Sequence, residues 1–249
     1  MINVAAEGRF LSAAILAGGE GRRLGTVAKE GIEGPEGPIG PALARRLGRV
    51  FEELLVLTKW PEFYTELASQ TAGRAGAADE RPRIRTLDDL RPGFGPLSGL
   101  HAALASSSSE WIYLTACDMP AFSPEFAAFL RDKIEAAEAF GERALGERPL
   151  AALARFGLHF EPFHAFYHRG LIPRLETLFS RASTTGGRRP SFKDLFEDLP
   201  VLFIPEDEVQ RFSPDWSLFF NINTPEELER FRGASHGEKP KASSTSLYL

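Results

Sequence analysis

The sequence predicts a single α/β domain in which helices cover both faces of a mostly parallel central sheet. Short apolar runs bounded by turn residues alternate along the chain with amphipathic stretches, as in successive βαβ units. The chain has 249 residues, a length that one α/β domain often reaches. Hydrophobic residues make up 43% of it and charged residues 25%, which allows a sizeable core, and no linker separates two cores.

Seven apolar runs are expected to form the strands of this sheet. Each is short and contains few charges, as is typical of strands that are buried on both faces. In chain order the runs are residues 10–17, 53–58, 83–87, 110–116, 150–155, 163–168 and 201–205.

Four amphipathic stretches are expected to form helices, because their apolar residues recur three and four positions apart. These stretches are residues 41–53, 96–107, 123–140 and 224–231. The third has Ser123 as its N-cap and Pro124 at its first helical position. The fourth has Thr224 as its cap and Glu227 three residues later, which together form a capping box.

The remaining segments are interpreted as loops or ends. Residues 31–40 carry glycine at every third position, too few triplets for a collagen helix, and are expected to form a loop. The serine run 106–109 connects a helix to a strand. The basic segment 181–189 is a loop that either meets a substrate phosphate or is simply solvated. We expect the domain to span residues 1–232 and segment 233–249 to be a flexible tail.

Charge and cysteine content narrow the classes of function. The net charge is −5, so nothing indicates a nucleic-acid or membrane-surface partner, and any anion site must be built locally from clustered cations. No apolar run approaches the ~20 residues that cross a bilayer, and no basic leader precedes the first run. The one cysteine, Cys117, excludes an intrachain disulfide framework. We therefore expect a cytoplasmic protein.

The glycine-rich segment LAGGEGRRLGTVAK (residues 16–29) begins at the last two residues of the first predicted strand. In open α/β sheets ligands bind beyond the carboxyl ends of the strands, and glycines let backbone N–H groups approach a phosphate closely. Arg22, Arg23 and Lys29 add cationic donors. The segment has the parts of a triphosphate cradle, although a solvated surface loop remains the alternative.

Two common phosphate-binding motifs are excluded by spacing. The dinucleotide motif G-x-G-x-x-G, read from Gly19, requires glycine where this chain has Leu24. A Walker A loop requires Ser or Thr after its Gly-Lys pair, whereas Lys29 is flanked by alanine and glutamate.

Three further segments have the residue types of a nucleotide and metal site. Asp118 follows a predicted strand in WIYLTACDMP, where its carboxylate suits Mg²⁺ or, alternatively, forms a turn. GFGPLSGLHAAL (residues 93–104) is a second glycine-rich loop that enters a helix. SLFFNINTPEEL places Asn221 and Asn223 before a capped helix, where an amide oxygen either reaches a metal or caps the turn.

The chain contains four motifs in this order: LAGGEGRRLG with Lys29, GPLSGL, CDMP and FFNINTPEEL. Their order and spacings resemble those of the molybdenum cofactor guanylyltransferases. These nucleotidyltransferases attach GMP to molybdopterin, and the resemblance covers residues 13–232, including EPFHAFY. It implies a Rossmann-like nucleotidyltransferase domain whose residues 10–120 bind the nucleotide and whose residues 121–232 bind the acceptor. The Gly18–Gly19 pair favours guanine, since the cytidylyl relatives tend to have LAAG there.

The resemblance also implies roles for individual residues. Lys29, Arg22, Arg23 and Asp118 are the expected catalytic residues, and Asp118 with Asn223 is expected to hold Mg²⁺. Thr58, or else Lys59, stands where the family often has an asparagine that touches the nucleotide. The expected GTP contacts are Leu16, Ala17, Gly18, Gly19, Lys29, Thr58, Asp88, Gly95, Pro96, Leu97 and Asp118.

The substrates implied are GTP and molybdopterin, and the implied partners are a molybdenum-insertion protein and molybdoenzyme maturation chaperones. Two positions depart from the family: Ala28 stands where an aspartate often precedes the lysine, and Gly37 replaces a usual lysine. They leave open a degenerate nucleotide-binding module, and cytidylyl or other nucleotidyl transfer remains a second alternative.

We expect the cysteine and three of the histidines to have no nucleophilic or metal-binding role. Cys117 is expected to be a small buried hydrophobe rather than a nucleophile. His164 and His168, if both lie on one strand, are about 13 Å apart along it, too far for one metal ion. We expect these histidines and His159 to serve in packing or near the pterin.

Overall fold

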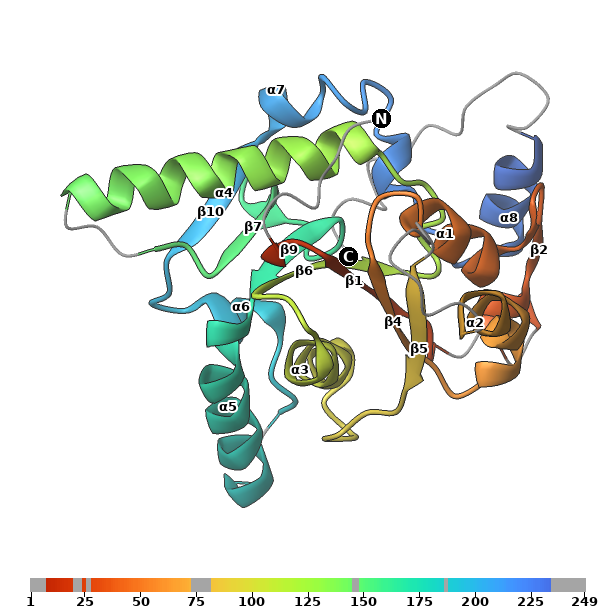
Figure 1. The fold of residues 1–249 in the computed structure, drawn as a ribbon, viewed down its shortest axis with the longest axis horizontal. Coiled ribbons are helices and arrows are strands. Elements are labelled where there is room, and N and C mark those ends of the chain that lie inside the picture. The colour runs from red at the N-terminus through yellow and green to blue at the C-terminus, as the bar shows by residue number, and fades with distance from the viewer. Residues whose placement is uncertain are drawn as a thin grey trace.

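A computed structural model of the chain describes residues 8–19, 24–25, 28–72, 82–144, 148–185 and 188–233. It confirms the predicted α/β fold with a mostly parallel central sheet (Figure 1). The predicted tail lies outside the described residues, apart from Gly233, which ends the last helix. Among the described residues, none of the helices combines the length and the apolar character that a bilayer crossing demands.

The main sheet has eight strands in the order β10-β7-β9-β6-β1-β4-β5, with the short β8 paired to β7. All seven predicted strands are present. Only β9 and β8 run antiparallel to their neighbours. The strands are β1 (Ser12–Leu16), β4 (Glu53–Leu57), β5 (Arg83–Leu87), β6 (Trp111–Ala116), β7 (Ala151–Phe156), β8 (His159–Phe160), β9 (Ala165–His168) and β10 (Val201–Pro205).

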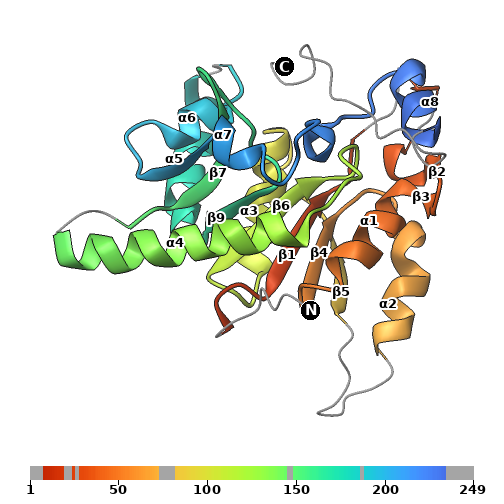
Figure 2. The ribbon, with the colours of Figure 1, turned by 90° about the horizontal axis from the view of Figure 1, so that it is seen from above.

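Helices cover both faces of the sheet, with α4 on one side and α3 and α5 on the other (Figures 1 and 2). The α4 face also carries α1, α2 and α7, and the α3 face also carries α6. The helices are α1 (Ile39–Leu47), α2 (Thr65–Ala72), α3 (Pro96–Ser106), α4 (Pro124–Ala144), α5 (Ile172–Thr185), α6 (Phe192–Phe196), α7 (Glu206–Val209) and α8 (Pro225–Gly233).

The apolar residues of each central strand are divided between two cores. In β1, Ala13 and Ile15 pack on the α4 side, whereas Ala14 packs on the α3 side. Successive side chains of a strand point to opposite faces, so a strand between two helical layers needs an apolar residue at almost every position. The continuous apolar runs in the sequence have this cause.

Both predicted helix caps are confirmed. The Ser123 hydroxyl accepts a hydrogen bond from the backbone N–H of Phe126 at 3.0 Å, at the start of α4. At α8, Thr224 Oγ1 accepts from the Glu227 N–H at 3.3 Å, and Glu227 Oε2 accepts from the Thr224 N–H at 3.0 Å. These bonds satisfy N–H groups that have no partner within the helix.

Two loop predictions are corrected. Residues 31–40 contain a two-stranded hairpin, β2 (Glu33–Gly34) and β3 (Gly37–Pro38), followed by the first turn of α1. Gly37 has φ = +93°, a conformation that favours glycine at this turn. The predicted basic loop 181–189 is helical in its first half, because α5 continues to Thr185. Residues 107–109 do connect α3 to β6 as predicted.

The parallel strands β1, β4 and β6 end in register. Leu16 is paired with Leu57 on one side and with Ala116 on the other. The N–H groups of Ala17 and Gly18 both donate to the carbonyl oxygen of Leu57, at 2.9 and 3.0 Å. The segments that follow these three strands therefore meet at one edge of the sheet, where ligands of open α/β sheets bind.

Candidate active site

Lys29 lies at the centre of this carboxyl edge. Its ammonium Nζ donates to Oδ2 of Asp118 at 2.9 Å and to Oδ1 of Asn223 at 2.6 Å. The three residues come from a short 3₁₀ helix, η3 (Lys29–Gly31), from the turn after β6 and from the segment before α8. The side chains of Lys29 and Asp118 are 14% and 22% exposed, so the group is accessible to a ligand.

Backbone hydrogen bonds hold Asp118 and Asn223 together. The N–H of Ile222 donates to the carbonyl oxygen of Asp118 at 2.8 Å, which joins two segments far apart in the sequence. The Asn223 N–H donates to Oε2 of Glu227 at 2.8 Å. The carboxylate that caps α8 therefore also fixes the backbone of the asparagine.

The oxygens of Asp118 and Asn223 fit a hard divalent cation. Both lie within hydrogen-bond distance of one nitrogen, so one cation can contact both. Mg²⁺ is typically held by one or two carboxylates together with substrate phosphates and water. Among the described residues no group of three His, Cys, Asp or Glu side chains is placed to bind a metal. A cation here would therefore need phosphate or water oxygens as well.

The glycine-rich segment lies beside two lysines. A Cβ built on Gly19 would be 4.0 Å from Cδ of Lys29, and one built on Gly18 would be 3.9 Å from Cγ of Lys59. The expected contacts Leu16 and Ala17 precede these glycines at the end of β1. Arg22 and Arg23 lie outside the described residues.

Thr58 and Lys59 have different surroundings. Thr58 is buried; its hydroxyl donates to the carboxylate of Glu30 and accepts from the Trp60 N–H at 2.8 Å. Lys59 is exposed and lies near Gly18. Of the two residues considered for the nucleotide contact, Lys59 has the side chain at the surface of the site.

The second glycine-rich segment leads into α3 at the same edge. Asp88 follows β5 and is exposed, and Gly95 caps α3 with φ = +61°. The Pro96 ring is exposed, whereas Leu97 is buried in the core. A Cβ on Gly99 would lie 2.6 Å from Cδ2 of Leu16, so α3 packs directly on the end of β1.

Glu161 is a residue of this edge to which no role was assigned from the sequence. It follows β8, is buried, and accepts a hydrogen bond from the Phe163 N–H at 3.0 Å. Burial, together with the nearby Asp118 charge, raises the pKa of Glu161 to about 7. Glu161 could have been noticed in the sequence because it precedes Pro162 in EPFHAFY, but this segment was interpreted only as a strand.

Cys117 and His164 are buried, as expected. Burial raises the pKa of the Cys117 thiol well above its ordinary value, which does not favour a nucleophilic thiolate. His164 does not lie on a strand as assumed: it precedes β9 with φ = +52°, and its Nδ1 lies 3.1 Å from the Tyr113 hydroxyl. Burial lowers the pKa of His164 to about 3, so it is a neutral packing residue at neutral pH.

Known proteins resemble this chain in fold and in sequence. The structure of a molybdopterin-guanine dinucleotide biosynthesis protein A from Archaeoglobus fulgidus superposes with a TM-score of 0.64 at 25% identity, over 90% of this chain and 98% of that one. A nucleotidyl transferase from Methanothermobacter thermautotroptrophicus has the same fold, with a TM-score of 0.59 at 15% identity, over 90% of this chain and 96% of that one.

The fold and the site at its carboxyl edge define a nucleotidyltransferase. Residues 13–199 match the model of the MobA-like NTP transferase domain, and the chain belongs to this family. A probable molybdenum cofactor guanylyltransferase from Peptoclostridium acidaminophilum is 32% identical, over 93% of this chain and 92% of the relative. A molybdenum cofactor guanylyltransferase from Syntrophotalea carbinolica is 30% identical, over 92% and 94%.

Proposed function

We propose that the protein is a molybdenum cofactor guanylyltransferase, which transfers GMP from GTP to molybdopterin and releases pyrophosphate. The observation that carries this function is the convergence of Lys29, Asp118 and Asn223 beside the glycine-rich end of β1. The names of relatives that are 30–32% identical over most of the chain support the choice of nucleotide and acceptor.

The reaction needs alignment and charge stabilisation rather than a covalent enzyme intermediate. An oxygen of the terminal phosphate of molybdopterin forms a bond to the α-phosphorus of GTP, and the bond from that phosphorus to the pyrophosphate oxygen breaks. Lys29 supplies positive charge to the phosphates, and the N–H groups of the glycine-rich segment supply donors. Asp118 and Asn223 would hold Mg²⁺, which would supply positive charge beside the phosphate oxygens.

The ammonium of Lys29 has two sets of partners in this scheme. Without substrate it is held by Asp118 and Asn223, which orient its side chain toward the site. With GTP bound, the ammonium would contact phosphate oxygens instead, and Asp118 and Asn223 would be available to hold Mg²⁺. The lysine is thus kept in place before the nucleotide binds, which lowers the cost of aligning it.

We assign each of the two substrates to one half of the domain. Residues 10–120 contribute the glycine-rich segment, Lys59 and the start of α3, and we assign GTP to this half. Residues 121–232 contribute Asn223 and Glu161, and we assign the acceptor to it. The single cysteine is free and buried, which suits a cytoplasmic enzyme. A molybdenum-insertion protein and maturation chaperones are the partners that would receive the product.

A substrate panel tests this function. Purified protein is incubated with Mg²⁺, molybdopterin and GTP, CTP, ATP or UTP in turn, and both pyrophosphate and dinucleotide product are measured. We expect product with GTP and much less with the other nucleotides. Preferential use of CTP would overturn the guanylyl assignment, and tight GTP binding without any turnover would identify a non-catalytic nucleotide-binding module.

A further inference from the structure

A buried carboxyl group lies directly beside the central lysine. Glu30 follows Lys29 in η3, and it is fully buried, whereas Lys29 reaches the accessible edge. The hydroxyl of Thr58 donates to Oε1 of Glu30. Since the two residues are consecutive and one is fixed in the core, the position of Glu30 constrains the backbone from which the Lys29 side chain extends.

The space around Glu30 is closely fitted. A Cβ on Gly40 in α1 would lie 2.7 Å from Cβ of Glu30 and would also clash with the hydroxyl of Tyr64. Only glycine at this position leaves room for both side chains. Thr58 is itself held by the Trp60 N–H at 2.8 Å, so the chain Trp60–Thr58–Glu30 connects the end of β4 to η3.

Two buried polar atoms near Glu30 lack hydrogen-bond partners among the described residues, namely Oε2 of Glu30 and the hydroxyl oxygen of Tyr64. Burying a carboxylate without a compensating partner is costly, whereas the neutral acid is tolerated far better. Of the titratable groups packed around it, Glu62 and Tyr64 come from the 3₁₀ helix η4 (Pro61–Tyr64) and Cys117 from the end of β6. Lys29 comes from η3 itself, and its ammonium is bound to Asp118.

We propose that Glu30 is a positioning residue for Lys29: its buried carboxyl, held by the hydroxyl of Thr58, fixes η3 so that the Lys29 ammonium lies between Asp118 and Asn223. The inference rests on the proposed function in assigning Lys29 to the phosphates of GTP. Burial raises the pKa of Glu30 to about 7; the hydrogen bond from Thr58 opposes this rise, and the charge of Glu62 adds to it. Its ionisation therefore falls within the range of an ordinary activity profile, and the buried negative charge that it creates weakens the packing that holds η3.

Three variants and one control test this role. Glu30→Gln keeps the shape and an acceptor oxygen for Thr58 but cannot ionise. Glu30→Ala removes the anchor, and Thr58→Val removes only its hydroxyl. Glu33→Gln, in the exposed strand β2 of the same segment, is the matched control. For each variant kcat and KM for GTP are measured from pH 6 to 9, and folding is checked by thermal unfolding.

We expect Glu30→Ala and Thr58→Val to lower kcat at least about tenfold with a smaller change in KM, because small misplacement of an aligned group is costly. Glu30→Gln is expected to match the wild type at pH 6. Relative to this variant, wild-type kcat should fall as the pH rises through 7. Wild-type kcat in Thr58→Val, or a ratio of wild type to Glu30→Gln that is constant with pH, would overturn the proposal.

A measurement without substrate separates this proposal from the proposed function. The ε-methylene NMR signal of Lys29 in lysine-labelled protein, assigned by its loss in Lys29→Arg, reports the contact with Asp118 and Asn223. We expect it to move toward the position of exposed lysines in Glu30→Ala and Thr58→Val but not in Glu33→Gln. An unmoved signal would refute the positioning role, whereas a moved signal in a protein without guanylyl transfer would refute only the function.

Discussion

The oxygens that hold the Lys29 ammonium are the ones that we assign to Mg²⁺. Asp118 carries the charge of the pair, since Asn223 offers only a neutral amide oxygen. In the proposed reaction this carboxylate would serve twice, because it orients the lysine without substrate and would bind the cation once the nucleotide is present. The loss of its charge is therefore expected to affect both functions.

For Asp118→Asn we expect turnover to fall by about 10²-fold or more, the scale observed when one transition-state-stabilising group is removed. The variant keeps the shape of the side chain but weakens its affinity for Mg²⁺, so higher Mg²⁺ concentrations should restore part of the activity. Steady-state kinetics over a Mg²⁺ series measures this. Asp132→Asn, in an exposed position on α4, is the control and should behave as wild type. Undiminished turnover in a well-folded Asp118→Asn protein would remove Asp118 from the role of principal metal ligand.

The sequence predicted Asp118 from its place after an apolar strand, because a carboxylate there must lie at the carboxyl edge of the sheet. Lys29 lies thirteen residues beyond β1, which ends at Leu16; its charge and its glycine-rich segment indicated a phosphate contact, whereas its catalytic role came from the family resemblance. The burial of Glu30, Thr58 and Glu161 was not predicted. A glutamate or threonine in a loop is usually solvated, and which ones are covered depends on how segments distant in sequence pack.

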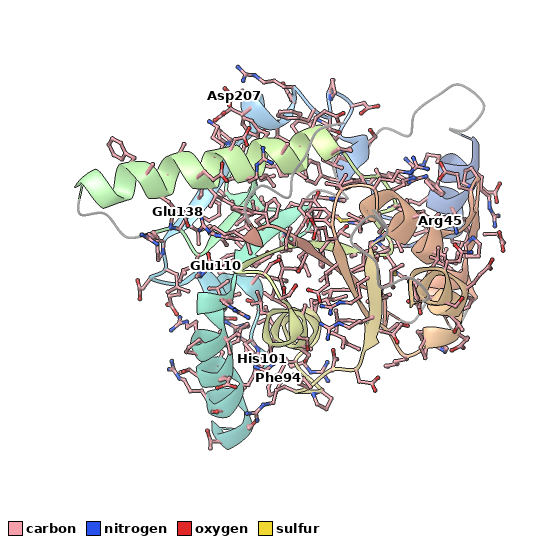
Figure 3. The ribbon with its side chains drawn as sticks, viewed as in Figure 1. Arg45, Phe94, His101, Glu110, Glu138 and Asp207 are labelled. Atoms are coloured by element: carbon pink, nitrogen blue, oxygen red, sulfur yellow. The ribbon has the colours of Figure 1, made fainter. Side chains whose placement is uncertain are left out.

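At the level of elements, α3 packs directly on the end of β1, at the carboxyl edge where we expect GTP to bind. Gly99 faces Leu16, which is one of the residues expected to contact GTP. On the far side of α3, Phe94 stacks on Phe179 of α5 at 4.3 Å between ring centroids, and His101 lies edge-on to the same ring; both residues are labelled in Figure 3. The helix is therefore fixed by α5 and cannot easily shift away from β1.

For Gly99→Ala we expect the Leu16 side chain to move rather than the helix, since the new Cβ would lie 2.6 Å from Leu16 Cδ2, the far end of a flexible side chain. The expected result is a KM for GTP raised several-fold, by analogy with the ~10²-fold cost of a 1 Å misplacement, and a nearly unchanged kcat. Steady-state kinetics with varied GTP measures both. Ala105→Gly, at an exposed position of α3, controls for altered helix propensity. An unaltered KM with Leu16 displaced would place Leu16 away from the nucleotide.

All strands of four or more residues and the helices α1, α3, α4 and α8 were predicted from the sequence, whereas the other helices and the two-residue strands were not. The central strands β1, β4 and β6 are apolar runs that are buried almost throughout, whereas β5 has one buried residue, Ile84. Strands β2, β3 and β8 have two residues each, too few for any periodicity, and β2 and β3 lie in a glycine-rich segment. The end of α5 is rich in Ser and Thr and resembled a loop, but apolar residues earlier in the helix, among them Leu175 and Phe179, pack in the core and keep it helical.

At the scale of the whole molecule, the pKa values of buried acids are shifted in opposite directions at the two edges of the sheet. At the carboxyl edge Glu30 and Glu161 are buried with few donors, and burial raises the pKa of each to about 7. At the amino edge Glu53, the first residue of β4, receives hydrogen bonds from Ser12 at 2.6 Å, Ser108 at 2.9 Å and Arg83 at 2.6 Å. Burial alone would raise the pKa of Glu53, but these donors lower it to about 2.

We interpret this difference in hydrogen bonding between the two edges in terms of the proposed function. A buried acid that is fully hydrogen-bonded stabilises the fold, whereas natural proteins tolerate poorly satisfied groups mainly at functional sites. A salt-bridge network on the same amino side, in which Arg9 binds Glu110 at 2.8 Å and Glu138 at 2.9 Å, follows the stabilising pattern. Glu110 and Glu138 lie near each other below α4 in Figure 3. The unsatisfied carboxyl oxygen of Glu30 thus supports the site that we propose at the carboxyl edge.

These shifts give stability a defined dependence on pH. Glu53 has a folded pKa below its unfolded value, so its contribution is complete above pH 4.5 and is lost as the pH falls toward 2. His164 acts in the same direction, between its ordinary pKa of 6.5 and about 3. Glu30 and Glu161 act in the opposite direction, because a raised pKa adds stability below pH 4.5 that is lost as the pH rises to 7. The opposing terms partly cancel between pH 4.5 and 6.5, and acid unfolding should set in steeply below that window.

The variant Glu53→Gln tests how much the hydrogen-bonded carboxylate at the amino edge contributes to stability. We expect it to lower the free energy of unfolding at pH 7 by roughly 2 kcal/mol, because hydrogen bonds to a charged group are lost while the buried side chain remains. The difference from wild type should shrink as the pH falls from 4.5 toward 2, where the wild-type carboxylate also becomes neutral. Urea unfolding at several pH values between 7 and 3 measures this difference. Glu52→Gln, the exposed neighbour, should stay within about 0.5 kcal/mol of wild type throughout. A Glu53→Gln difference that is the same at pH 7 and pH 3 would mean that the network does not hold the carboxylate ionised, and the contrast between the two edges would fail.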